Sequence, residues 1–285
     1  MTVIWSGLTL GAIYGLVALG YNIVFVTSNV FNFAHAQLLT LGTFIAFWAT
    51  VTLKLPTVLV FLLCAVIVAA VAVVEERIAI RPVRGTEGQL VTTVGFLTLL
   101  EGVTQLIWGG QPLQVPFFGS EKVLSVFGGR VFPVELMLMG ALVVFAAIFV
   151  AVSRGTMLGI AMLAVSEDRE AALMRGINVR AMAIGAFAVS GALAGLLGPV
   201  VGPETFAVVS LGSSLALKGF VAMAIGGFGS GPGALIGGIT VGLIESESGR
   251  YLGESYSNLM VFTALLAVML LRPTGLFGHA RERVV

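Results

Sequence analysis

The chain has 285 residues, of which 58% are hydrophobic and only 10% are charged, and its formal net charge is +1 at pH 7. A soluble domain carries roughly 25% charged residues, so this composition excludes a soluble globular enzyme, a disordered chain and a secreted disulfide scaffold. The mean hydropathy of +1.07 instead predicts an all-α polytopic membrane protein.

A membrane-spanning helix needs about 20 mostly apolar residues. The sequence contains about eight or nine such segments, depending on how 36–53, which follows a polar break, and the short segment 214–228 are counted. Their expected boundaries are 5–27, 36–53, 56–74, 89–108, 134–152, 181–200, 214–228, 233–248 and 256–271.

The positions of Lys and Arg between these segments predict the orientation, because cytoplasmic connections carry an excess of both. With the C-terminus in the cytoplasm and alternating spans, the basic residues divide unequally, and nine crossings place the N-terminus outside. The inside group is Arg77, Arg81, Arg84, Arg154, Arg169, Arg175, Arg180, Arg272, Arg281 and Arg283, and the outside group is Lys54, Lys122, Arg130, Lys218 and Arg250.

Two connections are long, and they suggest a single transmembrane domain over 1–285 with one elaborated loop on each side. Residues 109–133 are rich in Gly, Pro and aromatic residues and are expected to form an external loop. Residues 153–180 hold the densest charge in the chain and are expected to form a cytoplasmic loop.

No enzyme or metal motif is found. Cys64 is the only cysteine and lies in an apolar run, so no internal disulfide or cysteine metal cluster can form. His35 lacks co-ligands, and His279 is in the tail, so no metal site is expected. There is no nucleophile elbow and no HExxH motif, and the small net charge indicates no nucleic-acid partner.

The charged part of 153–180 is predicted to contain a short surface helix. Ser166 is expected to cap its first turn, Arg175 lies at its negative end, and Gly176 suits the left-handed position that terminates a helix. The segment is either an ordinary amphipathic connector or a rigid knob that fits a groove on a cytoplasmic partner. Its residues are Ser166, Glu167, Asp168, Arg169, Glu170, Ala171, Ala172, Leu173, Met174, Arg175 and Gly176.

A polar break near residues 28–37 separates the first two apolar segments. Its side chains Asn29, Asn32, His35 and Gln37 can satisfy backbone groups that a broken helix leaves free. The break is either a capped loop at the membrane surface or a discontinuous helix that lines a polar pathway.

One further polar face is expected in 89–108, where Glu101 and Gln105 are four residues apart with Thr98 and Trp108 on the same side. A carboxylate within a span normally faces the bundle interior, paired or hydrated. A structural hydrogen bond or ion pair is slightly favoured over a group that lines the pathway.

Glycine marks two other features. The segment 226–234 has five glycines and a proline, which predicts a tight hairpin between two spans rather than a phosphate-binding loop. Small residues recur at helical spacing, which favours close helix packing. These are Gly7, Gly11 and Gly15, then Gly191 and Gly195, and then Ala234, Gly238 and Gly242.

Several of these segments together resemble the LivH-type permeases of bacterial branched-chain amino acid ABC importers. The resemblance rests on GLTLGAIYGLVALGYNIVF with FNFAHAQLLTLGTFIA, and on ERIAIRPVRG with LVTTVGFLTLLEG. It continues in MLGIAMLAVSEDREAALMRGINV, KGFVAMAIGGFGSGPGALIGGITVGLIES and LLRPTGLFG. It covers nearly the whole chain and is weakest in 109–133.

The resemblance implies a non-catalytic subunit of the bacterial inner membrane. It would pair with a homologous second permease, two cytoplasmic ATPase subunits and an extracytoplasmic substrate-binding protein. The partner ATPases would use ATP and Mg, and this chain would bind no cofactor. The loop that contains 166–176 would dock on the ATPases. The binding protein largely selects the solute, and the family also includes importers of urea, short amides and other amino acids.

Three other classes of membrane protein are alternatives to a permease subunit. An ion-coupled secondary transporter or channel would need a coupling site within the membrane, for which Glu101 is the clearest candidate. An intramembrane enzyme lacks a catalytic set, and a receptor or structural protein is disfavoured by the dense glycines and polar breaks.

Overall fold

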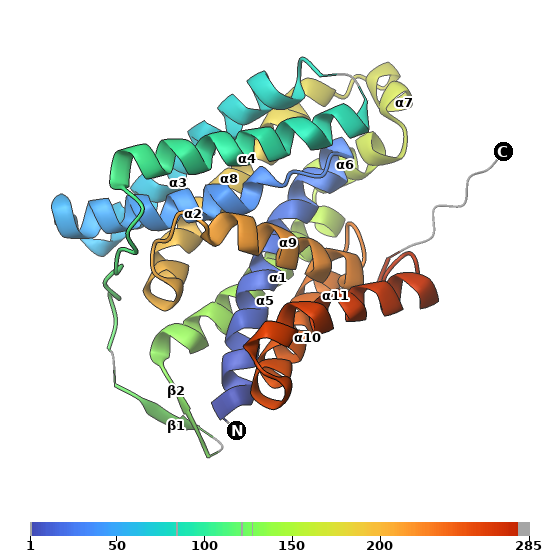
Figure 1. The fold of residues 1–285 in the computed structure, drawn as a ribbon. Coiled ribbons are helices and arrows are strands. Elements are labelled where there is room, and N and C mark those ends of the chain that lie inside the picture. The colour runs from blue at the N-terminus through green and yellow to red at the C-terminus, as the bar shows by residue number, and fades with distance from the viewer. Residues whose placement is uncertain (1, 84, 121, 127, 279–285) are drawn as a thin grey trace.

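A computed structural model describes residues 2–83, 85–120, 122–126 and 128–278. Arg84, Arg281 and Arg283 from the orientation argument, and His279, lie outside the described residues. The predicted all-α fold is confirmed, and the described chain also contains one small β-hairpin (Figure 1). The elements are α1 (Thr2–Ser28), α2 (Ala34–Phe47), η1 (Trp48–Thr52), α3 (Thr57–Glu75), η2 (Glu76–Ile80), α4 (Thr86–Trp108), β1 (Leu124–Val126), β2 (Gly129–Val131), α5 (Pro133–Gly155), α6 (Met157–Glu167), α7 (Arg169–Met174), α8 (Val179–Thr205), α9 (Leu211–Gly226), α10 (Gly231–Leu252) and α11 (Glu254–Leu271).

Seven helices of the described chain are long and apolar enough to cross a membrane. The π-helical turns η1 and η2 extend α2 and α3 within two of these seven. The helix α9 is apolar but shorter, and α10 carries Glu245, Glu247 and Arg250. The predicted count of eight or nine crossings depends on these two helices and stays a prediction.

Two helices extend beyond their expected ends. The span expected at 56–74 continues through η2 to Ile80, which places Glu75 and Glu76 inside the helical segment. The span expected at 181–200 continues to Thr205 through Pro199 and Pro203. Proline is tolerated within membrane helices because neighbouring groups satisfy the freed carbonyls, so these prolines do not end the helix as they would in water.

The bundle has two distinct ends (Figure 1). At the β-hairpin end, Trp5 near the start of α1 donates from Nε1 to the Val126 carbonyl at 3.3 Å. At the opposite end, which we call the α7 end, Leu276 after α11 donates its N–H to the carbonyl of Ile225 at 2.9 Å. The described parts of the N- and C-terminal regions therefore lie at opposite ends of the bundle.

The centre of the fold is a glycine contact between α1 and α10. A Cβ added to Gly242 would lie 2.2 Å from the Gly11 nitrogen, and one added to Gly238 would lie 2.5 Å from the Gly15 Cα. Only glycine lets the two backbones approach this closely. The glycine faces read from the sequence are therefore helix-packing faces.

A second close contact joins α8 to α2 and α3. A Cβ on Gly195 would lie 2.3 Å from the Cys64 carbonyl oxygen, and one on Gly198 would lie 2.3 Å from the Gly42 carbonyl carbon. Cys64 is fully buried here.

The predicted hairpin in 226–234 is confirmed as the turn between α9 and α10. Gly227 and Gly229 have φ of 109° and 77°, which side chains rarely allow. Asn22 of α1 holds the turn, since its Oδ1 accepts from Gly229 N–H at 2.8 Å and its Nδ2 donates to the Ser230 carbonyl at 3.1 Å.

The loop 109–133 contains structure that the sequence analysis did not predict. The strands β1 and β2 pair antiparallel, with Ser125 opposite Arg130. The loop also reaches the segment after α8, where Leu113 and Ala207 exchange backbone hydrogen bonds at 3.1 and 2.8 Å.

The α1–α10 contact gives a stability prediction for the purified chain. We expect Gly238→Ala and Gly242→Ala each to lower Tm, because overpacking of about 1–3 kcal/mol exceeds the gain of about 1 kcal/mol in helix propensity. Gly95→Ala and Gly102→Ala are matched controls on α4, where an added Cβ meets nothing within 4 Å. Equal melting shifts for the two pairs of variants in detergent would refute the packing role.

Candidate coupling segment and polar core

The charged segment 166–176 lies at the α7 end and forms the second half of a helix–kink–helix unit (Figure 1). The Thr156 hydroxyl accepts from Gly159 N–H at 3.0 Å and starts α6. The backbone becomes extended at Asp168, with φ −146° and ψ 107°, and α7 begins at the next residue.

The cap of α7 is Asp168, so the prediction that Ser166 caps this helix is wrong. One carboxylate oxygen of Asp168 accepts from the N–H groups of Glu170 and Ala171, both at 2.9 Å. Ser166 cannot cap, because the apolar run before it already forms α6 and its own backbone is helical. Its hydroxyl donates to the Leu163 carbonyl at 2.8 Å. Glu167 likewise ends α6 and is not in the first turn of α7.

The helix α7 is terminated at Gly176, as expected, and the φ of Gly176 is 81°. The Gly176 N–H donates to Leu173 O at 3.0 Å and the Ile177 N–H donates to Ala172 O at 3.1 Å. This pair of bonds is the Schellman motif, which satisfies carbonyls that a helix end leaves free. Both ends of α7 are thus fixed by hydrogen bonds.

A small apolar cluster docks α7 on the rest of the chain. Ala172 is the buried residue of α7 and packs with Val165 of α6, Val179 of α8 and Ile177. A helix of six residues is unstable in isolation, so these contacts hold it in place. The next two residues of α7, Leu173 and Met174, are 55% and 89% exposed. The unit therefore presents two apolar side chains outward from a fixed base.

The break between α1 and α2 is compact and mostly buried. Asn29 adopts φ 56° and is exposed, and its N–H donates to Phe25 O at 2.9 Å, which ends α1. The Asn32 Oδ1 accepts from Ala34 N–H at 2.9 Å, which starts α2. Since Val30, Phe31 and Asn32 are buried, the segment is not an open loop at the surface.

His35 joins α2 to α8 and α1. The Ser190 hydroxyl donates to Gly20 O at 3.1 Å and lies 2.8 Å from His35 Nδ1. Because a hydroxyl has one proton, the two hydrogen bonds form together only in the tautomer in which His35 Nδ1 carries the hydrogen and donates to Ser190. The imidazole fills the space beside Gly20, where a Cβ would lie 1.8 Å from Nε2.

Several polar atoms near the break lack a hydrogen-bond partner within the described chain. They are Nε2 of His35, both polar side-chain atoms of Gln37, Nδ2 of Asn32 and both oxygens of Glu75. Gln37 lies against Gly212 at the start of α9, and Glu75 lies beside Asn32 and Tyr21. Buried polar groups are costly when unsatisfied, so we expect water to enter this polar core.

The polar face of α4 separates into two parts. Glu101 accepts a hydrogen bond from the Ser213 hydroxyl of α9 at 3.0 Å, the structural role that the sequence slightly favoured. Gln105 and Thr98 are exposed on the outer side of α4, while the Trp108 ring lies 5.5 Å from that of Phe44. Because Ser213 follows Gly212, which lies against Gln37, Glu101 is joined to the edge of the polar core through the start of α9, whereas Gln105 lies on the exposed side of α4.

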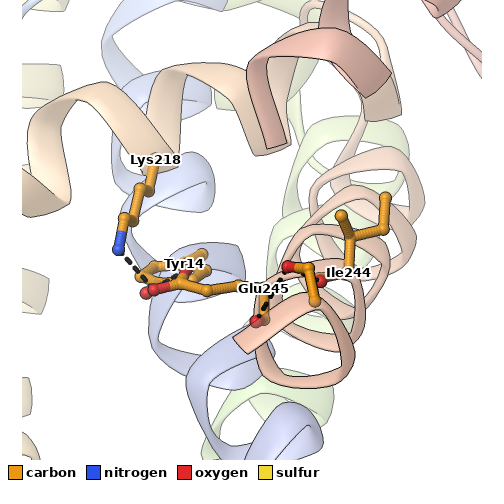
Figure 2. Close-up of polar contacts among 5 residues, drawn as sticks. Tyr14, Lys218, Ile244 and Glu245 are labelled. Atoms are coloured by element: carbon orange, nitrogen blue, oxygen red, sulfur yellow. Dashed lines mark hydrogen bonds and ion pairs between the residues drawn. The ribbon is translucent and has the colours of Figure 1, made fainter. Parts of the chain in front are cut away.

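An ion pair within the bundle was missed from the sequence. Lys218 of α9 pairs with Oε1 of Glu245 of α10 at 2.5 Å, and the Tyr14 hydroxyl of α1 donates to Oε2 at 2.7 Å. Figure 2 shows Lys218 and Tyr14 converging on the Glu245 carboxylate. Both charged side chains are only 15% exposed. The placement of Lys218 in an external connection is therefore wrong, because the residue lies within α9.

The missed residues left different signals in the sequence. A lysine inside the apolar segment 214–228 and a glutamate inside 233–248 are both unusual in membrane spans, and together they indicate a pair. Ser190 left no such signal, because a serine among small residues in a membrane helix is ordinary.

No metal centre is formed by the described residues, where no three His, Cys, Asp or Glu side chains lie close enough to hold an ion.

The chain was compared with known families and proteins. Residues 3–270 match the family model for the permease component of the branched-chain amino acid transport system. The high-affinity branched-chain amino acid permeases LivH of Escherichia coli K12 and BraD of Pseudomonas aeruginosa are both 30% identical to the chain, over 96% of it and 94% of their own length.

More distant relatives include a permease named for another solute. The ribose import permease RbsC of Haemophilus influenzae is 24% identical over 91% of this chain and 81% of its own length. Among solved structures, PsaBC from Streptococcus pneumoniae in complex with Fab matches in fold with a TM-score of 0.50 and 13% identity, covering 96% of this chain and 93% of that one.

These matches define the chain as the membrane-embedded permease component of an ABC transporter, a multi-pass protein of the inner membrane. It belongs to the branched-chain amino acid transport permease family. The resemblance read from the sequence motifs is confirmed.

The ion pair between Lys218 and Glu245 leads to a stability prediction for the purified chain. We expect Lys218→Met or Glu245→Met alone to lower Tm of the purified chain by about 5–10 °C, since removing one partner of a buried pair costs about 3 kcal/mol. The double variant should melt closer to the wild type, because it leaves no unpaired charge. Glu247→Met on the same helix is the control. Additive losses in the double variant would show that the two residues act independently.

Proposed function

We propose that this chain is the permease subunit of an ATP-driven importer for a small polar solute, with branched-chain amino acids as the first candidates. The match over residues 3–270 and the names of the LivH and BraD relatives support this substrate class. The ribose permease among the relatives, and the wider family of urea and short-amide importers, make related solutes the alternative.

The proposed assembly contains a second, homologous permease, two cytoplasmic ATPase subunits and an extracytoplasmic binding protein. ATP and Mg would be used by the ATPases, and this chain would act as one membrane domain, 1–285. The observation that carries the proposal is α7, a short helix capped at both ends and docked on its inner side, which exposes Leu173 and Met174.

The proposed orientation places the α7 end in the cytoplasm. Arg154, Arg169, Arg175 and Arg180 lie on or directly beside the α6–α7 unit, whereas Lys122 and Arg130 lie in the loop with the β-hairpin. A cytoplasmic excess of basic residues supports this choice. In this orientation 153–180 is the cytoplasmic loop and 109–133 is external.

A route for coupling follows from the contacts of α7. Its base packs against Val179, the first residue of α8, and α8 then runs through the bundle against α2 and α3. Ser190 on α8 hydrogen bonds to His35 on α2 and to the Gly20 carbonyl on α1. A displacement of α7 would therefore reach the polar core, where Asn32, His35 and Gln37 are the proposed pathway or gating residues.

The remaining sequence candidates have smaller roles in this proposal. Glu101 is engaged by Ser213, which disfavours it as the coupling site of an ion-driven transporter. Gln105, exposed on α4 in the single chain, and Asn29, exposed at the break, stay candidates for the pathway or the permease–permease contact.

The docking role is tested by Met174→Glu in the assembled transporter, co-expressed with its ATPases and sister permease. We expect at least a tenfold loss of ATPase co-purification and of solute uptake, because a charge would enter an apolar contact. Val123→Glu, an equal change in the external loop, is the control and should leave both unchanged. Wild-type uptake with full ATPase retention in Met174→Glu would reject the docking role.

The rigidity of α7 is tested separately at its cap. We expect Asp168→Ala to reduce uptake several-fold, since losing an N-cap costs about 1 kcal/mol, and Asp168→Asn to restore most of it because Asn also caps. Uptake coupled to ATP hydrolysis is measured in proteoliposomes. Equal losses in both variants would indicate that the negative charge, and not the cap, is required.

A further inference from the structure

A cavity of about 460 Å³ lies at the α7 end and is used by none of the roles described above. Its walls come from the end of α1, the η2 turn and the segment after it, α4, the first residue of α7 and the start of α8. A second cavity of about 390 Å³ adjoins it and shares Ser28, Gln89 and Arg169. Such a volume is in the range of a small-ligand site.

The larger cavity is lined by more positive than negative charge. Arg81, Arg169 and Arg180 line it, from three separate parts of the chain, and Glu76 is its one acidic lining residue. Among the described residues none of these arginines forms an ion pair, since the ion pair recorded there is Lys218 with Glu245. Three guanidinium groups share the cavity with one carboxylate, Glu76, which interacts electrostatically with Arg81, and the remaining excess of positive charge favours an anionic ligand.

Backbone groups add to this preference. Gly85 lines both cavities and Thr86, the first residue of α4, lines the second. The α4 N-terminus has no side-chain cap, so its first N–H groups can donate to an anion, while Glu87 in the same turn offsets part of the positive end of the helix dipole. Gln89 holds the preceding loop in place by donating to the Val83 carbonyl at 3.1 Å.

We propose that this cavity binds a phosphate group, carried either by the headgroup of an anionic phospholipid or by a soluble phosphate. The planar forks of Arg81 and Arg180 would hold the phosphate oxygens. Arg169, which is the first residue of α7, would bind the same ligand. The bound phosphate would thereby fasten α7 to α4 and α8. Only this last effect on transport rests on the proposed coupling function.

The location agrees with the headgroup level of a membrane. The cavity lies where α1 and η2 end and where α4 and α8 begin, at the ends of four apolar helical segments. Basic pockets between membrane helices on the cytoplasmic side are known to bind lipid phosphates.

Binding is tested on the purified chain without ATPases. Native mass spectrometry counts lipids retained from nanodiscs of phosphatidylglycerol or phosphatidylcholine, and a thermal-shift titration with inorganic phosphate forms the second arm. We expect retained phosphatidylglycerol, little phosphatidylcholine, and at least a tenfold weaker retention in Arg81→Gln/Arg180→Gln. Arg154→Gln is the control, because it removes one positive charge at the same end outside the cavity walls, and Arg81→Gln alone is its match in charge.

Each outcome decides the proposal. Loss confined to the phosphatidylglycerol arm identifies a lipid headgroup, and loss in both arms identifies a site that accepts soluble phosphate too. Retention that falls equally in Arg154→Gln, or in neither variant, overturns the site. If the double variant does not fold, Arg81→Lys keeps the charge without the planar fork, and unchanged retention in that variant overturns the proposal. Failure of the Met174→Glu test leaves these binding measurements untouched.

Discussion

The absence of water in the hydrocarbon part of a bilayer is the constraint on which this structure depends, because every backbone polar group that faces lipid must find its partner within the protein. The hydrophobic effect does not draw helices together in lipid, so close packing must do so. The glycines of α1 and α10 meet this requirement, since they let Gly11 and Gly242 approach to backbone distance. The N-terminal and C-terminal parts of the sequence are thereby joined in one central contact.

The same constraint explains where the polar residues lie. At the break between α1 and α2, the Asn32 side chain accepts from the Ala34 N–H, a group that a continuous helix would have paired within its own backbone. His35 is held by Ser190, and the Glu245 carboxylate is shared by Lys218 and Tyr14. The His35–Ser190 and Tyr14–Glu245 contacts join helices that are distant in sequence, and the Lys218–Glu245 pair joins the consecutive helices α9 and α10. The polar groups thus serve as fixed links between helices, and those left unpaired, such as Gln37, are concentrated near the break.

The sequence predicted features that depend on local composition. The length of the apolar runs placed the helices to within a few residues, and Gly227 and Gly229 predicted the hairpin because their backbone angles require glycine. The end of α7 at Gly176 follows from the same reasoning. The cap was misplaced because Ser166 and Asp168 are both good caps, and only the extent of α6 decides between them. The link between Lys218 and Glu245 could not be fixed, since it depends on how α9 packs against α10.

The position of α7 follows from a balance between these local and distant forces. Two hydrogen-bonded caps determine its shape, but a helix of six residues gains little stability of its own, so its place on the bundle depends on Val165, Ala172, Ile177 and Val179. The side of α7 that packs on the bundle is small, and its outer face is apolar. A partner bound to that face would therefore exert force on a segment that is internally stiff, yet joined to the bundle through few contacts. Because one of those contacts is the first turn of α8, and α8 packs against α2 and α3, the contacts of α7 continue through α8 to Ser190 and His35 in the interior of the bundle.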